Sequence, residues 1–147
     1  MEQQTIYLFV HIILEVEDHK PLLKNVLRVV YFSWLKKTMA EKGVRLQAIG
    51  GGEDHVHLLV QLHPAQNLMQ VVRQLKEESL NFIGSNHFSK ENFAWKDSYT
   101  AFSVSPGAFK QTQDYIERQE EYHQQKTFAQ EMEQISKTRI DIHESNT

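Results

Sequence analysis

The sequence predicts an α+β fold in which helices cover an antiparallel four-stranded sheet, and three observations lead to this prediction. Four segments are rich in β-branched and aromatic residues, as strands are. Three other segments carry apolar residues at helical spacing. Three glycines at 50–52 separate two of the strand-like segments, and so short a connection makes those two strands antiparallel. At 147 residues the chain is long enough for one domain with a hydrophobic core.

The first half of the chain predicts two strands around a long helix. Residues 5–16 are apolar with almost no alternation, which indicates a central strand buried on both faces. Residues 21–42 predict a helix, with Pro21 in its first turn and Gly43 at its exit. Residues 44–49 alternate apolar and polar side chains, as a half-buried strand does.

The second half repeats this pattern of strand, helix and strand. Residues 54–62 predict the third strand, directly after the glycine turn. Asn67 is a suitable N-cap for a helix over residues 68–83. Residues 93–104 are aromatic and β-prone, and they predict the fourth strand.

A further helix follows the fourth strand. Ser105 as N-cap and Pro106 at the first helical position begin it, and it should run to about Gln125. The order β-α-β-β-α-β-α then describes a ferredoxin-like sheet with an added C-terminal helix. We expect a single domain over residues 1–130 and a polar tail over residues 131–147.

Composition restricts the possible classes of protein. Hydrophobic residues make up 40% and charged residues 24%, an ordinary balance for a globular protein. The chain has no cysteine, so thiolate metal sites and cysteine nucleophiles are excluded and a metal must take nitrogen or oxygen ligands. No apolar run reaches the roughly 18 residues of a membrane span, and no signal peptide is recognisable. We therefore expect a cytoplasmic protein that does not enter a membrane.

Charge is distributed unevenly along the chain, although its formal net value is only -3. Residues 20–45 contain seven Lys or Arg residues and one acid, whereas acids predominate from residue 111 onward. A basic segment is consistent with a local surface for nucleic-acid phosphates, and a solvated basic helix is the competing interpretation.

Two histidines stand one residue apart in the third predicted strand. Side chains alternate faces along a strand, so His55 and His57 point the same way and Val56 points into the core. Two neutral imidazoles in this arrangement can hold one divalent ion if a third ligand lies nearby. A pair that merely lines a half-exposed sheet face is the alternative. His11 in the first strand could lie near the pair, although a satisfied core histidine is the simpler interpretation.

The last predicted helix carries a tyrosine and a glutamine four residues apart. Tyr115 and Gln119 therefore share one helix face. A tyrosine that attacks a phosphodiester conserves the bond as a phosphotyrosine ester, which allows later rejoining. Because free tyrosine has a pKa of about 10, a metal ion that polarises the phosphate would help. Gln119 could be the third ligand, an oxygen donor suited to Mg²⁺ or Mn²⁺. A helix that packs Tyr115 against the sheet is the alternative.

These motifs together resemble the HUH single-tyrosine transposases of the smallest bacterial insertion sequences, the insertion-sequence-200-like family. The resemblance covers roughly residues 5–130. The matching stretches are residues 51–60 (GGEDHVHLLV), 75–76 (LK), 93–95 (FAW), 101–105 (AFSVS) and 115–119 (YIERQ), with His123 after them.

The resemblance implies a catalytic centre and a substrate. Tyr115 would be the nucleophile that leaves a 5′-phosphotyrosine and a free 3′-OH. His55, His57 and Gln119 would hold Mg²⁺ or Mn²⁺. The substrate would be single-stranded DNA with subterminal hairpins, bound at the nucleoid by a homodimer. Whether the tyrosine helix completes the site of its own subunit or of its partner stays open.

Several side chains are candidates for DNA contacts, either as cations for phosphates or as rings that stack on unpaired bases. They are Lys24, Arg28, Lys36, Lys37, Arg45, Lys76, Trp95 and Tyr99.

Two alternatives stay open at this point. One is another HUH enzyme, either a replication-initiator-like nickase or a domesticated relative that processes chromosomal hairpins. The other is a non-catalytic module that binds single strands or hairpins. The presence of His55, His57, Tyr115 and Gln119 together argues against the second, because a pure binding module has no need of all four.

Overall fold

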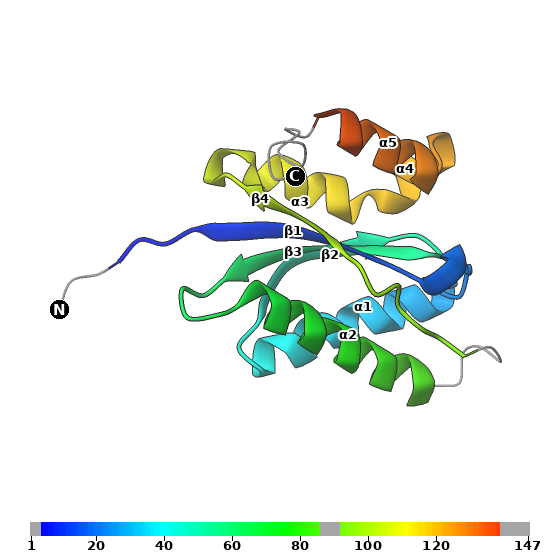
Figure 1. Ribbon diagram of the computed structural model, residues 1–147, viewed down its shortest axis with the longest axis horizontal. Coiled ribbons are helices and arrows are strands. Elements are labelled where there is room, and N and C mark those ends of the chain that lie inside the picture. Colours follow the sequence, from blue (N-terminus) through cyan, green and yellow to red (C-terminus); the bar gives the residue numbers. More distant parts are fainter. Residues whose placement is uncertain (1–3, 86–91, 139–147) are drawn as a thin grey trace, which may run out of the picture.

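A computed structural model of the chain describes residues 4–85 and 92–138 (Figure 1). Four strands form one sheet in the order β2-β3-β1-β4, and every neighbouring pair is antiparallel. The strands are β1 (Leu8–Glu15), β2 (Arg45–Gly51), β3 (His55–Leu62) and β4 (Thr100–Val104). The predicted α+β, ferredoxin-like arrangement is confirmed. Within the described residues, no helix has the length and apolar character needed to cross a membrane.

The helices cover the two faces of the sheet unequally (Figure 1). Two long helices lie on one face, and three shorter ones that follow β4 lie on the other. The long helices are α1 (Asn25–Glu41) and α2 (Leu68–Ser85); the shorter ones are α3 (Phe109–Glu117), α4 (Gln119–Gln125) and α5 (Phe128–Thr138). Asn67 caps α2 as predicted, because its Oδ1 accepts hydrogen bonds from the backbone N–H of Met69 (2.9 Å) and of Gln70 (3.3 Å).

The hydrophobic core lies between the sheet and the two long helices. Alternate residues of β3, Val56, Leu58 and Val60, are fully buried there, together with Leu27 and Leu35 of α1. The opposite face has only a small apolar cluster, made by Phe9, Ala48, Leu59 and Ile116. That face therefore has room for polar side chains beside the sheet.

The start of α1 differs from the prediction. A short 3-10 turn, η1 (Glu17–His19), and an extended stretch precede it, so Pro21 lies outside the helix. Asp18 and His19 have φ values of 58° and 53° in this turn. Nothing in the local pattern of the sequence marks this turn, because neither residue is a glycine.

The glycine run also differs from the prediction. Gly50 and Gly51 belong to β2, and only the stretch from Gly52 to Asp54 forms the turn into β3. Gly50 is required by a close approach, since a Cβ there would stand 1.8 Å from the carbonyl oxygen of Ile116 in α3.

The fourth strand is shorter than predicted. Only Thr100–Val104 pairs with β1, while Trp95 makes an isolated bridge to Val16. Trp95 and Phe93 pack edge to face with ring centroids 4.8 Å apart, so their aromatic character reflects core packing rather than strand pairing.

The single helix predicted from Pro106 to Gln125 is wrong. The structure has a 3-10 turn, η2 (Pro106–Ala108), then α3 and α4, which a break at Arg118 separates. No Gly or Pro marks that break in the sequence. Its consequence is that Gln119, at the start of α4, is buried against the sheet.

Candidate metal centre and active site

The two histidines of β3 project from the sheet toward α4 and α5. His55 and His57 are 1% and 0% exposed, and Val56 between them lies in the core, as the alternation of a strand predicts. Gly52 in the preceding turn makes room for the first ring, since a Cβ there would stand 2.9 Å from Cε1 of His55. The absence of a side chain in the β2–β3 turn thus allows the ring of His55 to occupy its position.

Two contacts with the edge strand β2 fix the position of α3. A β-bulge interrupts the β2–β3 register between Leu46 and Ala48, and the carbonyl oxygen of Gln47 in this bulge accepts a hydrogen bond from Nε2 of Gln113 (3.1 Å). One turn later the backbone of Ile116 lies directly on Gly50. Both contacts involve residues of α3 on either side of Tyr115.

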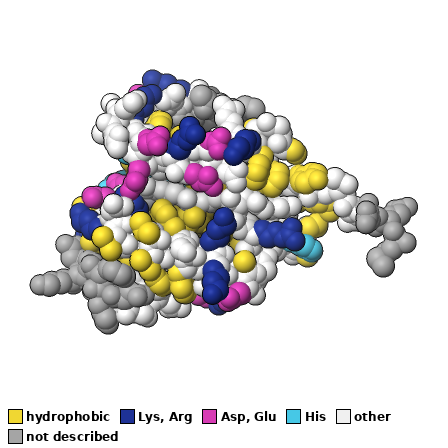
Figure 2. All heavy atoms as spheres, turned by 180° about the vertical axis from the view of Figure 1, so that it is seen from behind, with side chains coloured by type: hydrophobic (Ala, Val, Ile, Leu, Met, Phe, Trp, Pro, Cys, Tyr) yellow, Lys and Arg dark blue, Asp and Glu magenta, His cyan; other side chains and the backbone are white. Residues whose placement is uncertain are grey.

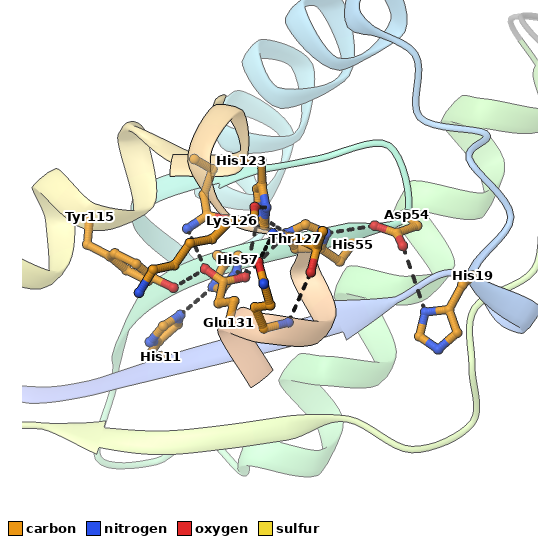
Figure 3. Close-up of polar contacts among 12 residues, drawn as sticks. His11, His19, Asp54, His55, His57, Tyr115, His123, Lys126, Thr127 and Glu131 are labelled. Carbon is orange, nitrogen blue, oxygen red and sulfur yellow. Dashed lines mark hydrogen bonds and ion pairs between the residues drawn. The ribbon is translucent and has the colours of Figure 1, made fainter. Parts of the chain in front are cut away.

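Five polar side chains converge above β3, and Figure 3 labels four of them, His55, His57, His123 and Glu131. The five are His55 and His57 of β3, Gln119 and His123 of α4, and Glu131 of α5. Oε1 of Gln119 lies 3.2 Å from Nε2 of His55 and 2.9 Å from Nε2 of His123, and the two imidazole nitrogens are 3.0 Å apart. The break at Arg118 is what lets Gln119 reach this point.

Glu131 lies between the histidines and the tyrosine. Its Oε1 is 3.1 Å from Nε2 of His57, 3.7 Å from that of His55 and 3.5 Å from that of His123. Its Oε2 accepts a hydrogen bond from Nε2 of Gln119 (3.0 Å) and another from the hydroxyl of Tyr115 (Figure 3). One carboxylate therefore joins the histidine pair to the tyrosine.

Each histidine of the pair has an outer partner on its other nitrogen. Nδ1 of His55 lies 2.9 Å from Oδ1 of Asp54, and Nδ1 of His57 lies 2.8 Å from Nε2 of His11. Such partners fix the ring orientation and the position of the proton. Both Nε2 atoms consequently face the same point. Phe128 of α5 stacks on His55 with ring centroids 3.8 Å apart and an interplanar angle of 13°.

Burial and hydrogen bonding set the charges of the site. Burial disfavours the Glu131 carboxylate, but hydrogen bonds from His57, Tyr115 and Gln119 outweigh it and lower the Glu131 pKa to about 2. Burial lowers the pKa of His57, and burial, with the repulsion that a protonated His57 would add, lowers the pKa of His11 to about 3. The site therefore combines an ionised Glu131 carboxylate with a His57 imidazole that favours its neutral form, the protonation states that bind a divalent cation.

The donor set suits a hard or borderline divalent ion. Ligand atoms of His55, His57 and Glu131 all lie within 4.8 Å of one another and all three residues are buried. Carboxylate and amide oxygens suit Mg²⁺ and Mn²⁺, whereas imidazole nitrogens suit softer divalent ions such as Zn²⁺. The residues present fit such a cation, and the structure adds Glu131 to the ligands predicted from sequence.

Tyr115 is less buried than the histidines, and its ring meets His57 edge to face at 5.7 Å. Burial and the neighbouring Glu131 carboxylate raise the pKa of Tyr115 above its ordinary value, because both disfavour a phenolate. A counter-charge near the hydroxyl is therefore needed before this tyrosine can act as a nucleophile.

A cleft of about 320 Å³ opens beside the site. Its walls include Gly51 at the end of β2, the Gly52–Asp54 turn and His55, and also Arg28, His123, Lys126 and Phe128. On the other side of α4 a shallow hollow is lined by Tyr115, Arg118 and Tyr122 among others.

The candidate DNA contacts are scattered. Lys36, Lys37 and Arg45 are exposed, and the first two lie on α1, across the sheet from the histidines. Figure 2 shows Lys and Arg side chains interspersed with Asp and Glu rather than gathered in one patch. Lys24 pairs with Glu53 (3.4 Å) at the edge of the cleft.

Four candidates, Arg28, Trp95, Lys76 and Tyr99, have structural roles that the sequence did not reveal. Arg28 is 8% exposed and donates hydrogen bonds to the carbonyl of Leu23 (2.7 Å) and to Glu120 (3.0 Å), so it ties α4 to α1. Trp95 is 7% exposed in the core, which corrects the expectation that its ring is available to bases.

The third of these, Lys76, donates to the backbone carbonyls of Lys96 (2.8 Å) and Asp97 (3.1 Å). Its ammonium lies 5.9 Å from the ring centre of Tyr99, which is partly buried against the core. Both side chains thus hold the segment before β4.

Glu131 is the residue that sequence reasoning missed. It lies in the expected tail, whose boundary after residue 130 falls inside α5. A signal was present: Phe128, Glu131 and Ile135 share one face of that helix, and an acid inside an apolar stripe indicates a buried polar contact.

Comparison with known proteins assigns the family. The family model for "Transposase IS200 like" matches residues 4–119. A "putative transposase" from Deinococcus radiodurans R1 is similar in structure, with 24% identity, a TM-score of 0.61, and coverage of 81% of this chain and 96% of that one.

A REP-associated tyrosine transposase bound to a REP hairpin is also similar in structure, with 13% identity and a TM-score of 0.56, over 79% of this chain and 70% of that one. A search of curated proteins gave no match. Because the family model covers most of the chain, this protein belongs to the IS200-like transposase family.

Proposed function

We propose that this chain is a single-tyrosine HUH transposase that cuts and rejoins single-stranded DNA through a covalent link to Tyr115. One observation carries the proposal: the hydroxyl of Tyr115 and Nε2 of His57 meet at the two oxygens of a single buried carboxylate, that of Glu131. Metal-assisted phosphoryl transfer requires a nucleophile close to the ligands of a cation. Glu131 contacts both, and so it places Tyr115 beside the candidate cation ligands.

We assign the cation ligands to His55, His57 and Gln119, with Glu131 as an additional carboxylate donor. Bound Mg²⁺ or Mn²⁺ would polarise the scissile phosphate and offset its developing charge. Within the chain, Asp54 and His11 orient the two imidazoles, and Gln119 donates its amide N–H to Glu131 (3.0 Å).

The reaction proposed is a transesterification at phosphorus. The oxygen of Tyr115 forms a bond to phosphorus as the bond to the 3′-oxygen breaks, the phenol gives up its proton, and the 3′-oxygen leaves as a hydroxyl. Attack by another 3′-hydroxyl on the phosphotyrosine reverses the step and rejoins DNA. Glu131 must release the tyrosine hydroxyl for this step, so we infer that α5 shifts when DNA binds.

We propose a hairpin-bearing single strand as substrate, bound by a homodimer. The similar structure described as bound to a REP hairpin supports the DNA class. Our candidates for phosphate contacts are Lys24, which pairs with Glu53 of the cleft (3.4 Å), and the exposed Lys36, Lys37 and Arg45.

A second candidate function is a non-catalytic hairpin-binding module. The complete burial of His57 and Glu131 favours it, because no phosphate reaches these atoms while α5 is in place. The two functions differ in one product, a covalent protein–DNA adduct.

The test uses single strands that carry the hairpins flanking the gene, labelled at the 5′ or the 3′ end, with Mn²⁺. We expect an adduct that retains the 3′ label and is lost in Tyr115→Phe. Tyr122→Phe is the matched control, since Tyr122 lies beside Tyr115 with ring centroids 5.5 Å apart. Hairpin binding without an adduct would support the binding module, and cleavage that survives Tyr115→Phe would contradict the proposed nucleophile.

A further inference from the structure

His11 is a buried histidine that the proposed reaction does not use directly. It lies on β1 opposite Leu59 of β3, one diagonal step from His57 on the same face of the sheet. Its Nε2 is 2.8 Å from Nδ1 of His57 (Figure 3). The rings of Phe102 (6.1 Å) and Tyr115 (6.2 Å) border it, so its orientation is restricted.

The hydrogen bond between these two histidines can have either polarity, because each neutral imidazole carries one proton on one of two nitrogens. The partner of Nε2 of His57 determines which of the two histidines is the donor. Without a cation, Nε2–H of His57 donates to Oε1 of Glu131 (3.1 Å), and Nδ1 of His57 must then accept from Nε2–H of His11. With a cation at the site, Nε2 of His57 has to carry a lone pair, so its proton must stand on Nδ1 and be donated to His11.

We propose that His11 is a positioning residue for the cation site, and that the His11–His57 hydrogen bond reverses its donor when the cation binds. This inference rests on the proposed cation site at His55 and His57. His11 touches neither the cation nor DNA in this account. It acts through the ring of His57, by accepting the Nδ1 proton that directs the Nε2 lone pair toward the other ligands.

The reversal balances protons without changing the charge of either ring. The proton on Nε2 of His11 moves along the 2.8 Å hydrogen bond to Nδ1 of His57. His57 gives up the proton on its Nε2 to solvent as the cation binds, and His11 takes one up from solvent on its Nδ1. Both imidazoles stay neutral, so the cation site gains its ligand without leaving a buried positive charge beside it.

A histidine at position 11 differs from the usual partner of a metal-bound histidine. A backbone carbonyl or a carboxylate, the usual partners of a metal-bound histidine, can only accept a hydrogen bond. An imidazole can donate or accept at the same nitrogen, so it satisfies Nδ1 of His57 both with and without the cation. A glutamine can do the same by rotating its amide, whereas leucine can do neither.

The first test measures Mn²⁺ binding alone, by isothermal titration calorimetry and by the electron paramagnetic resonance signal of free Mn²⁺. We expect His11→Leu to weaken Mn²⁺ binding by about 10- to 100-fold. His11→Gln should restore most of the affinity. Phe102→Leu is the matched control: it removes a ring that borders His11 but no hydrogen bond, so its affinity should equal that of the wild type.

The second measurement uses the wild-type protein and keeps the proposal testable even if His11→Leu does not fold. ¹⁵N spectra of the imidazoles, recorded with and without Mg²⁺, report which nitrogen carries the proton. We expect the His57 proton on Nε2 without Mg²⁺ and on Nδ1 with it, and the same exchange from Nε2 to Nδ1 at His11.

The outcomes separate this inference from the proposed function. Wild-type affinity in His11→Leu, or an unchanged His57 tautomer in Mg²⁺, overturns the role of His11 while leaving the cation site in place. Loss of affinity in His11→Leu that His11→Gln does not restore also overturns it, because the effect is then one of packing. Wild-type protein that binds no Mn²⁺ overturns both.

Discussion

The two faces of the sheet have opposite characters. The face under α1 and α2 is an apolar core built from β1, β3 and both helices, whereas the face under α3 to α5 buries His57, Gln119 and Glu131 around a small apolar cluster. Burial of apolar surface stabilises without regard to direction, but buried polar groups are stable only when their partners are in place. We infer that the face under α1 and α2 provides most of the stability of the fold, and that the other face provides the candidate active site.

The strand β3 allows the clearest test of this division, because neighbouring residues serve opposite faces. Leu58 is fully buried in the core, next to His57 on the other face. We expect Leu58→Ala to lower the free energy of unfolding by about 2–5 kcal/mol, since it leaves a cavity, while Mn²⁺ affinity of the folded protein is retained. Urea unfolding followed by circular dichroism measures the first and calorimetry the second. A loss of Mn²⁺ binding in folded Leu58→Ala would contradict the division.

Acid should weaken the polar face in a predictable direction. Burial lowers the pKa of His11 to about 3 from 6.5, so the unfolded chain binds this proton more tightly than the folded chain. The stability contributed by neutral His11 is fully present above about pH 6.5. It is lost as the pH falls toward 3, at up to about 1.4 kcal/mol per pH unit for one proton.

Urea unfolding at pH 7, 6, 5 and 4 measures this dependence. His11→Leu should show a shallower loss of stability with falling pH than wild type, and Phe102→Leu should keep the wild-type slope. Equal slopes in wild type and His11→Leu would mean that His11 does not contribute.

The approach of α3 to the sheet depends on Gly50. A Cβ at this position would stand 1.8 Å from the carbonyl oxygen of Ile116, so α3 must move. We expect Gly50→Ala to cost about 1–3 kcal/mol of stability and to weaken Mn²⁺ binding, because Gln119 follows Ile116.

Gly84→Ala is the matched control, since nothing lies within 4 Å of a Cβ there and the helical position favours alanine. It should be neutral or slightly stabilising. If Gly50→Ala behaved like Gly84→Ala in both measurements, the contact between α3 and β2 would not position the site.

The smallest effect is expected on the surface. Lys36 is exposed on α1. If it contacts a phosphate, Lys36→Ala lowers hairpin affinity for all sequences alike and reduces the slope of log K against log salt by about 1, with stability unchanged. A filter-binding titration at several salt concentrations measures this slope. An unchanged slope would show that Lys36 does not contact a phosphate, and that the DNA does not follow this part of α1.

The sequence predicted features that depend on local patterns. The alternation of His55, Val56 and His57 shows which side chains share a face, and the glycine turn before them shows that the two strands it joins are antiparallel, so both features could be read directly. Gln119 was found by its spacing from Tyr115, although the helix between them breaks at Arg118.

The remaining features depend on contacts between distant residues. Glu131 meets His57 across 74 positions, and His11 meets His57 across 46, so local patterns do not identify the partner in either contact. Arg28 and Trp95 look like surface candidates by residue type, and only packing shows that they are buried.

The most direct test of the account is to identify the residue that joins the DNA. Wild-type protein is incubated with Mn²⁺ and a hairpin-bearing single strand, the adduct is digested with protease and nuclease, and the modified peptide is sequenced by mass spectrometry. We expect a nucleotide 5′-phosphate on Tyr115, with the adduct lost in His57→Ala. A phosphate on Tyr122, or cleaved DNA with no modified peptide, would contradict it.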